Sequence, residues 1–191
     1  MEGQYQTKAK DVWANFLTYN EEEGTYEFYV SFMCKNWGKP NRVHLVFDEK
    51  GKFIETKPFV YYKLTNQTME ETVEDHMSFA LHFKKMAQDL INSLIKPIKK
   101  ENIIFDQEKT TSWTDGDALR IFFKVEEINY YYYLYVNDPY RNILSCTCID
   151  EIGEYVIELD KIPSLKGLKP YVRNHPEIRV KFVNQLVGYK N

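Results

Sequence analysis

The sequence contains little glycine, proline or cysteine, and it has no long apolar run. With 8 Gly and 7 Pro among 191 residues, there is little room for long loops. No stretch approaches the roughly 18 to 20 apolar residues that a membrane-spanning helix needs. Residues 1–11 are polar and charged, unlike the apolar centre of a signal peptide. We therefore expect no association with a membrane and no secretory leader.

The cysteines are too few to form a disulfide framework. There are three of them, Cys34, Cys146 and Cys148, in a chain long enough to fold without cross-links. This count predicts a reducing compartment and a cytoplasmic location. Cys146 and Cys148 lie two residues apart, which in a strand places both thiols on one face. Because no second pair or nearby histidine completes a metal site, we expect them to be small core residues.

Motifs for catalysis and cofactor binding are missing too. The chain has no G-x-S-x-G, no Walker-type loop and no G-x-G-x-x-G. His76 and His82 are six residues apart, so on a helix they would point in different directions and could not chelate one metal. The sequence therefore predicts no enzyme, no metal site and no cofactor. An enzyme site assembled from His44, Asp48 and Asp150 is the minor alternative.

Charge is unevenly distributed along the chain. The net charge is −3, but residues 161–191 carry seven basic residues and one acidic residue, a net +6, which leaves −9 for the preceding 160 residues. The acidic body argues against nucleic acid as a partner, as do strands that carry Glu27 and Glu126 with few interleaved basic residues. The basic tail is expected to pair with the acidic body, with an anionic partner as the alternative.

What the sequence has in abundance is aromatic residues: 15 Tyr, 12 Phe and 3 Trp, or 16% of the chain. Aromatic side chains favour strands and bury large areas. In the first half, four strands are expected at residues 12–19, 26–34, 42–47 and 52–62, joined by short turns as in an antiparallel meander. Thr68 and Glu71 then form a capping box, and apolar residues spaced by three, four or seven predict a long helix near residues 68–96, packed on the sheet.

The second half repeats this order after a linking segment. Strands are expected at residues 119–126, 130–136, 142–149 and 154–159. A short helix at 164–173 and a C-terminal helix that begins at Pro176, behind Asn174, follow them.

The two halves resemble each other in sequence. The aromatic segment 26–30 matches 130–134, and Asp48-Glu-x-Gly51 matches Asp150-Glu-x-Gly153. We therefore predict an α+β fold with antiparallel sheet built from two tandem ββββα units, residues 1–100 and 101–191, that share one compact domain. Whether the strands form one sheet or two is left open, and the alternative is that any two meanders share such turns.

The run Tyr130-Tyr-Tyr-Tyr133, with Tyr135 beyond it, is the strongest candidate for a binding surface. Because alternate residues of a strand face opposite sides, some of these rings must point away from the core on one side. An exposed row of tyrosines recognises partners at low entropic cost. The predicted protein-binding residues share an outward position on strands or in neighbouring turns: Tyr131, Tyr133, Tyr135, Tyr29, Trp37 and Tyr140. The alternative is a sheet packed on both faces.

Taken together, these features favour a non-enzymatic cytoplasmic protein-binding module, such as an inhibitor, immunity or regulatory protein, that uses the Tyr-rich face of its sheet. The alternative is a carrier or sensor of a small apolar ligand, with a pocket between the helix and the sheet. A protein partner is expected, and a homodimer is left open.

Overall fold

The fold is built on one nine-stranded sheet. The computed structural model describes residues 9–34, 41–59, 68, 70, 74, 77, 80–113, 117–135, 137–138, 141–149 and 154–188. Within these residues the strands lie in the order β4-β3-β2-β1-β9-β8-β7-β6-β5. Neighbouring strands are antiparallel except for β1 and β9, which run parallel. The mixed helix and sheet fold with a mostly antiparallel sheet is thus confirmed, and its strands form one sheet.

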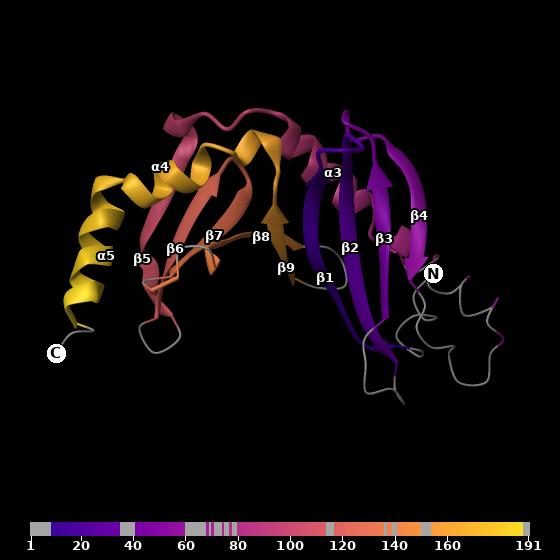
Figure 1. The fold of residues 1–191 in the computed structure, drawn as a ribbon, viewed down its shortest axis with the longest axis horizontal. Helices are drawn as coiled ribbons and strands as arrows, with labels where there is room; N and C mark the ends of the chain where they lie inside the picture. The colour runs from indigo at the N-terminus through magenta and orange to yellow at the C-terminus, as the bar shows by residue number, and fades with distance from the viewer. Residues whose placement is uncertain are drawn as a thin grey trace.

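Two meanders make up the sheet, and their strands lie close to the predicted positions. The first meander consists of β1 (Ala9–Asn20), β2 (Thr25–Cys34), β3 (Asn41–Phe47) and β4 (Phe53–Phe59). The second consists of β5 (Ile103–Trp113), β6 (Ala118–Val125), β7 (Ile128–Tyr135), β8 (Ile143–Ile149) and β9 (Glu154–Asp160). Figure 1 shows the meanders side by side, with β1 and β9 at the centre of the sheet.

Strand β5 corrects the sequence-based interpretation, which treated this segment as a link. After Phe105 its residues are polar up to Trp113, so the apolar alternation that marks the other strands is lost. It nevertheless pairs with β6 on both sides of an irregularity between Asp106 and Thr111. The second meander therefore has five strands rather than the four predicted.

The structure does not show the predicted tandem duplication of ββββα units. The sequence match aligned β2 with β7, but β7 runs parallel to β1 through β8 and β9, whereas β2 is antiparallel to β1. Both strands bury alternate residues against the same core. If a twofold rotation related β2 to β7, it would reverse the strand direction and keep the same face buried. The same rotation would also exchange the strands on the left and right of β2. Yet β3 and β8, which the match also aligns, lie on the same side of β2 and β7.

The two meanders join through a short parallel ladder. Among the described residues it consists of three pairs, in which Phe16, Leu17 and Thr18 of β1 face Glu158, Leu159 and Asp160 of β9. Leu17 and Leu159 are both buried, so the ladder continues the core across the junction.

The helices pack on one face of this sheet, because their buried side chains share one core with both meanders. They are α3 (Lys84–Ile95), α4 (Leu168–Asn174) and α5 (Pro176–Gly188), with the 3-10 turns η1 (Lys100–Asn102) and η3 (Pro163–Leu165). Helix α3 reaches β9 through Phe83, whose ring lies 5.4 Å from that of Tyr155. Both predicted C-terminal helical segments are present, and α5 begins at Pro176 as expected.

The long helix predicted near 68–96 is observed in part. Its final turns form α3, which ends before Lys96 and Pro97 as expected. Glu70, Glu74, Met77 and residues 80–82 are also helical, with a turn at Phe83. Glu71, the partner in the predicted capping box, lies outside the described residues.

One continuous core contains both meanders and the helices. Its largest fully buried side chains include Leu17, Phe28, Phe47, Phe83, Ile91, Ile121, Tyr130, Leu144 and Ile157. Burial of each such side chain stabilises the fold by about 1.5–3 kcal/mol. The folded state therefore depends on contacts between segments far apart in sequence.

The turn between β3 and β4 docks on α3. Asp48 shapes this turn because its Oδ1 accepts hydrogen bonds from the backbone N–H groups of Lys50 at 2.9 Å and Lys52 at 2.8 Å. Gly51 adopts a φ of +77°, and a Cβ added there would lie 2.9 Å from Ile91 Cγ2 of α3. The side-chain amide of Gln88 in α3 donates a hydrogen bond to the Gly51 carbonyl. The turn thus needs glycine both for its backbone conformation and for its close approach to α3.

We predict that Gly51→Ala lowers the free energy of unfolding by about 2–5 kcal/mol, from about 1–2 for the left-handed backbone and about 1–3 for overpacking against α3. Gly24→Ala is the matched control, because Gly24 has a φ of +68° but the atom nearest to an added Cβ is 3.8 Å away. The free energy of unfolding of Gly24→Ala should fall only by the backbone contribution. Urea denaturation measures both variants, and equal losses would show that the contact with α3 does not matter.

Candidate functional site

One face of the sheet is not packed against the described helices, and we call it the open face. The residues of β7 show the division: Tyr130, Tyr132 and Leu134 are at most 2% exposed in the core, whereas Tyr131, Tyr133 and Tyr135 are only partly buried. Since alternate side chains of a strand point to opposite sides, the three partly buried tyrosines lie on the open face.

A row of directly paired residues crosses the open face from one edge of the sheet to the other. From β4 to β5 it consists of Lys57, His44, Tyr29, Phe16, Glu158, Ser145, Tyr131, Phe122 and Asp106. Aromatic residues occur on both sides of Glu158. The face therefore has two aromatic clusters, one on each meander.

The cluster on the second meander is centred on an arginine, and we call it the Arg120 cluster. Its members are Trp113, Arg120, Phe122, Tyr131 and Tyr133. The Arg120 guanidinium carbon lies 4.3 Å from the centre of the Trp113 ring and 4.8 Å from that of Phe122. Phe122 meets Tyr131 edge-on at 4.6 Å, and Trp113 meets Tyr133 at 5.7 Å. Such cation–π and edge-to-face contacts hold each side chain in a fixed orientation.

An irregularity in β5 brings Trp113 into this cluster. Between Asp106, opposite Phe122, and Thr111, opposite Arg120, four residues of β5 face one of β6. The Thr110 hydroxyl donates a hydrogen bond to the Asp106 carbonyl at 2.6 Å and accepts one from the Phe122 N–H at 3.2 Å. The extra residues of β5 shift the alternation of its side chains by one position. Trp113 therefore points to the open face, the same side of the sheet as Asp106.

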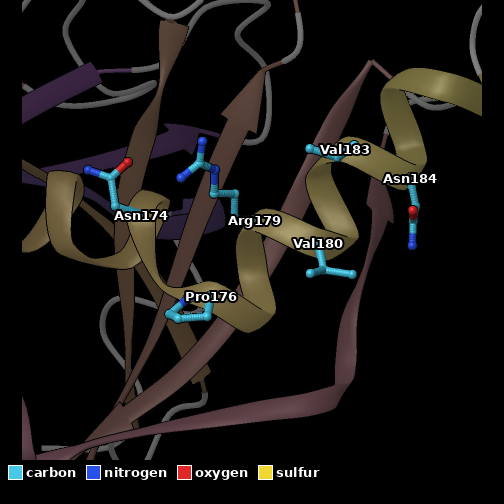
Figure 2. Close-up of a pocket in the computed structure, with 6 residues that line it drawn as sticks. All are labelled: Asn174, Pro176, Arg179, Val180, Val183 and Asn184. Carbon is cyan, nitrogen blue, oxygen red and sulfur yellow. The ribbon is translucent and has the colours of Figure 1, made fainter.

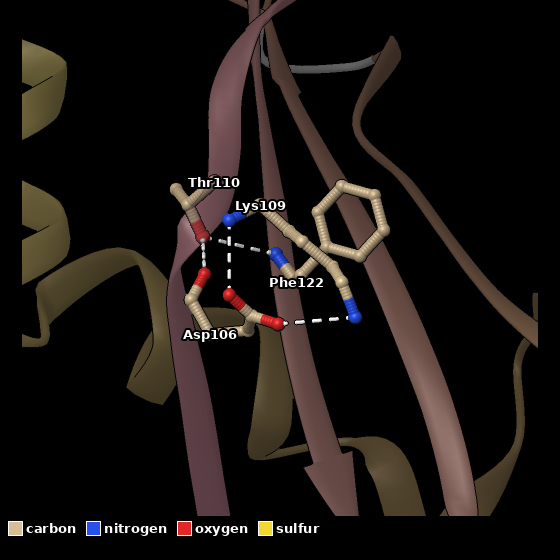
Figure 3. Close-up of polar contacts among 4 residues, drawn as sticks. All are labelled: Asp106, Lys109, Thr110 and Phe122. Carbon is tan, nitrogen blue, oxygen red and sulfur yellow. Dashed lines mark hydrogen bonds and ion pairs between the residues drawn. The ribbon is translucent and has the colours of Figure 1, made fainter.

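Helix α5 and a lysine stabilise the same irregularity. The Asp106 carboxylate accepts a hydrogen bond from the Lys109 N–H at 2.9 Å and forms an ion pair with the Lys109 ammonium at 3.2 Å (Figure 3). From α5, the Lys181 ammonium donates hydrogen bonds to the carbonyls of Gln107 and Thr110. Part of the edge of the sheet is therefore covered by α5, which limits strand pairing there.

The cluster on the first meander surrounds Tyr29, and we call it the Tyr29 cluster. The rings of Tyr29 and Phe16 stack at 4.3 Å with 13° between their planes, and His44 lies 4.8 Å from Tyr29. The Arg42 guanidinium carbon is 5.8 Å from the Tyr29 ring centre. The Tyr29 hydroxyl donates a hydrogen bond of 2.6 Å to Glu27. This cluster is therefore both aromatic and ionisable.

Burial and charge set the protonation of the Tyr29 cluster. Burial lowers the pKa of His44 below its ordinary value; Lys57 adds to this effect, whereas Glu27 and Glu55 oppose it. Burial acts to raise the pKa of Glu27, but hydrogen bonds from Tyr29 and Asn20, with the nearby His44 and Lys57, outweigh it, so that this pKa is lowered. At neutral pH we expect a neutral imidazole beside a carboxylate.

An acidic strand separates the two clusters. Glu154, Glu158 and Asp160 of β9 are all exposed, and Val156 between them is 53% exposed. Ile149 of the neighbouring β8 is 75% exposed. The open face thus combines apolar, aromatic and charged side chains within one surface.

The predicted binding residues lie partly on the open face and partly outside the described residues. Tyr131 and Tyr133 belong to the Arg120 cluster, and Tyr135 is the next residue of β7 on the same face. Tyr29 lies at the centre of the Tyr29 cluster. Trp37 and Tyr140 lie outside the described residues. Sequence reasoning missed Phe16, Trp113, Arg120 and Phe122. The alternation of β6 could have indicated two of them, because Arg120 and Phe122 lie out of phase with the buried Leu119, Ile121 and Phe123.

The remaining candidate chemistry lies elsewhere. Cys146 is buried and Cys148 is half-buried with its side chain against the core, as predicted for core residues. Within the described part of the chain, no group of three or more His, Cys, Asp or Glu residues could hold a metal ion. None of the described helices has both the length and the apolar character required to cross a membrane.

A hollow of about 520 Å³ lies along α5 (Figure 2). It is lined by Asn174, Pro176, Arg179, Val180, Val183 and Asn184. Val180 is 61% exposed and Val183 48% exposed, so this hollow opens to solvent. It is not the pocket between helix and sheet that a ligand carrier predicted.

Comparison with known proteins gives no match: no family model, curated protein or solved structure is significantly similar to this chain.

We predict that acidification destabilises the protein in two stages. Because the folded state favours neutral His44, its contribution to stability is complete above about pH 6.5 and declines as the pH falls below that value. Glu27, with its lowered pKa, contributes above about pH 4.5, and this contribution is lost as the pH falls further. Denaturation between pH 7.5 and 5.5 should show a smaller loss for His44→Gln than for wild type. An NMR titration that places the pKa of His44 above 6.5 would contradict this prediction.

We predict that Thr110→Val lowers the free energy of unfolding by about 1–3 kcal/mol, because the hydroxyl that bonds to Asp106 and Phe122 is lost. Thr111→Val, at the exposed neighbouring position, is the control and should change stability by about 0.5 kcal/mol or less. The indole N–H resonance of Trp113 should move in the first variant alone. An unchanged resonance in Thr110→Val would show that the irregularity does not position Trp113.

Proposed function

We propose that this protein is a non-enzymatic cytoplasmic binding module, of the inhibitor, immunity or regulatory kind, that recognises another protein with its open face. The observation that carries this proposal is the pair of ordered aromatic clusters on that face. Interface residues that contribute most to affinity are enriched in Trp, Tyr and Arg, and the Arg120 cluster combines all three.

Preorganisation supports this function. Trp113, Phe122 and Tyr131 are held by neighbouring rings and by the bonded irregularity of β5. A partner that binds such side chains does not need to order them, so less free energy is lost on association. The exposed Val156 and Ile149 add apolar area beside the clusters.

A crosslinking experiment tests the proposal. A photoreactive phenylalanine analogue replaces either Tyr133, on the open face, or Val183, exposed on α5, and each protein is irradiated in lysate of the source cell. We expect one stoichiometric protein crosslinked from position 133 and none from position 183. A crosslink from Val183 alone would place binding on α5 instead. A monomer without any crosslinked partner would contradict the proposal, and a crosslink to a second copy would make the partner a homodimer.

We further predict that Tyr131→Ser with Tyr133→Ser weakens binding of the crosslinked partner by about tenfold or more, since truncation of a central interface aromatic costs about 1–2 kcal/mol or more. Val180→Ser with Val183→Ser on α5 is the matched control and should bind as wild type does. Calorimetry measures both, and melting curves establish that each variant is folded. Equal affinities would exclude the tyrosines from the interface.

A further inference from the structure

The charge of the open face indicates which partner chemistry it suits. Three arginines lie over aromatic rings of this face or at its margin: Arg42 over Phe16 and Tyr29, Arg120 over Trp113 and Phe122, and Arg141 over Tyr135. The guanidinium of Arg120 is the most closely held, because it lies within 5 Å of two ring centres. Arg141 is exposed, and its guanidinium carbon lies 4.8 Å from the Tyr135 ring centre.

These arginines lack a carboxylate partner among the described residues. The ion pairs formed there all use lysine as the cation. Asp106, which faces Phe122 across β5 and β6, is already paired with Lys109. The Nε atom of Arg120 is buried and has no hydrogen-bond partner in the described structure.

An unbonded buried donor costs about 1–3 kcal/mol, so a native structure rarely retains one without a reason. Stacking on two rings leaves the N–H groups at the edge of the guanidinium, which is the geometry that binds a carboxylate through two parallel hydrogen bonds. Because Arg120 is only partly buried, a carboxylate supplied by a partner could neutralise the cation through its terminal N–H groups.

The acidic strand limits where such a partner lies. Glu154, Glu158 and Asp160 of β9 are exposed, and β9 lies between the Arg120 cluster and the first meander, with β8 next to the cluster. These carboxylates repel an anionic segment that extends toward the first meander. They also disfavour nucleic acid, whose phosphates continue along the whole strand. A short acidic segment over β5, β6 and β7 fits this pattern of charge.

We propose that the Arg120 cluster, as part of the protein-binding face proposed above, binds an acidic segment of its partner, with one carboxylate on Arg120 between Trp113 and Phe122 and a second near Arg141. The aromatic rings hold the guanidinium in place and exclude water from the contact. The contact contributes charge selectivity in addition to the apolar area that the tyrosines supply.

Binding of a defined acidic peptide tests this proposal. The probes are capped hexaglutamate, capped hexaglutamine and a twelve-residue oligothymidylate, each titrated into the ¹⁵N-labelled full chain while the Arg Nε–H and Trp indole N–H resonances are recorded. We expect hexaglutamate to shift the resonances of Arg120 and Trp113, and hexaglutamine to leave them in place. Tighter binding of oligothymidylate than of hexaglutamate would overturn the proposal, as would a complete absence of shifts at millimolar hexaglutamate.

Three variants assign the effect to one side chain. Arg120→Gln should weaken hexaglutamate binding at least tenfold, and Arg120→Lys should restore only part of it, because the ammonium keeps the charge without the paired N–H groups. Arg179→Gln, which removes an exposed arginine from α5, should bind as wild type does. Equal binding by Arg120→Gln and wild type would refute the carboxylate contact. The wild-type resonance shifts remain decisive if Arg120→Gln is unstable.

The two proposals can fail separately. A natural partner that is lost on substitution of Tyr131 and Tyr133 but retained by Arg120→Gln would leave the binding face intact and exclude the acidic contact. Hexaglutamate binding at Arg120 without any crosslinked protein partner would support the carboxylate contact and contradict the proposed protein-binding function.

Discussion

Burial of a single face of the sheet is the constraint on which the rest of the structure depends. Both meanders direct most of their buried apolar side chains to one side, where Phe28 and Leu45 of the first and Ile121 and Ile157 of the second share a core with the helices. Because side chains alternate along each strand, this arrangement places every other residue of nine strands on the opposite face. The open face is thus a consequence of how the core is formed.

The edge of the second meander shows how local irregularity contributes to that face. A regular continuation of β5 from the pair of Asp106 with Phe122 would have placed Glu108 opposite Arg120 and directed Trp113 toward the helices. The irregularity stabilised by Thr110 reverses this arrangement, and Lys181 of α5 bonds to the same backbone. One local feature therefore both limits strand pairing at the edge and brings Trp113 to the ring cluster.

Charge distinguishes the two aromatic clusters of the open face. The Tyr29 cluster has an internal anion, because Glu27 accepts hydrogen bonds from Tyr29 and Asn20 beside His44. The Arg120 cluster has a cation without a matching anion in the described structure. Because the acidic strand β9 lies between the two clusters, the charge of the open face changes from one meander to the other. Such a pattern of alternating charge favours specificity and orientation of a partner more than affinity.

From the sequence alone, the positions of eight strands, the end of α3 and the start of α5 followed, because alternation, turn residues and proline act locally. Local signals also indicated that alternate tyrosines of β7 differ in exposure. Only the tertiary structure decided that β1 and β9 join two meanders into one sheet, that polar β5 is a strand, and that Trp113 meets Arg120. These features depend on contacts between distant segments, and a one-residue change in alternation has no clear local signature in the sequence.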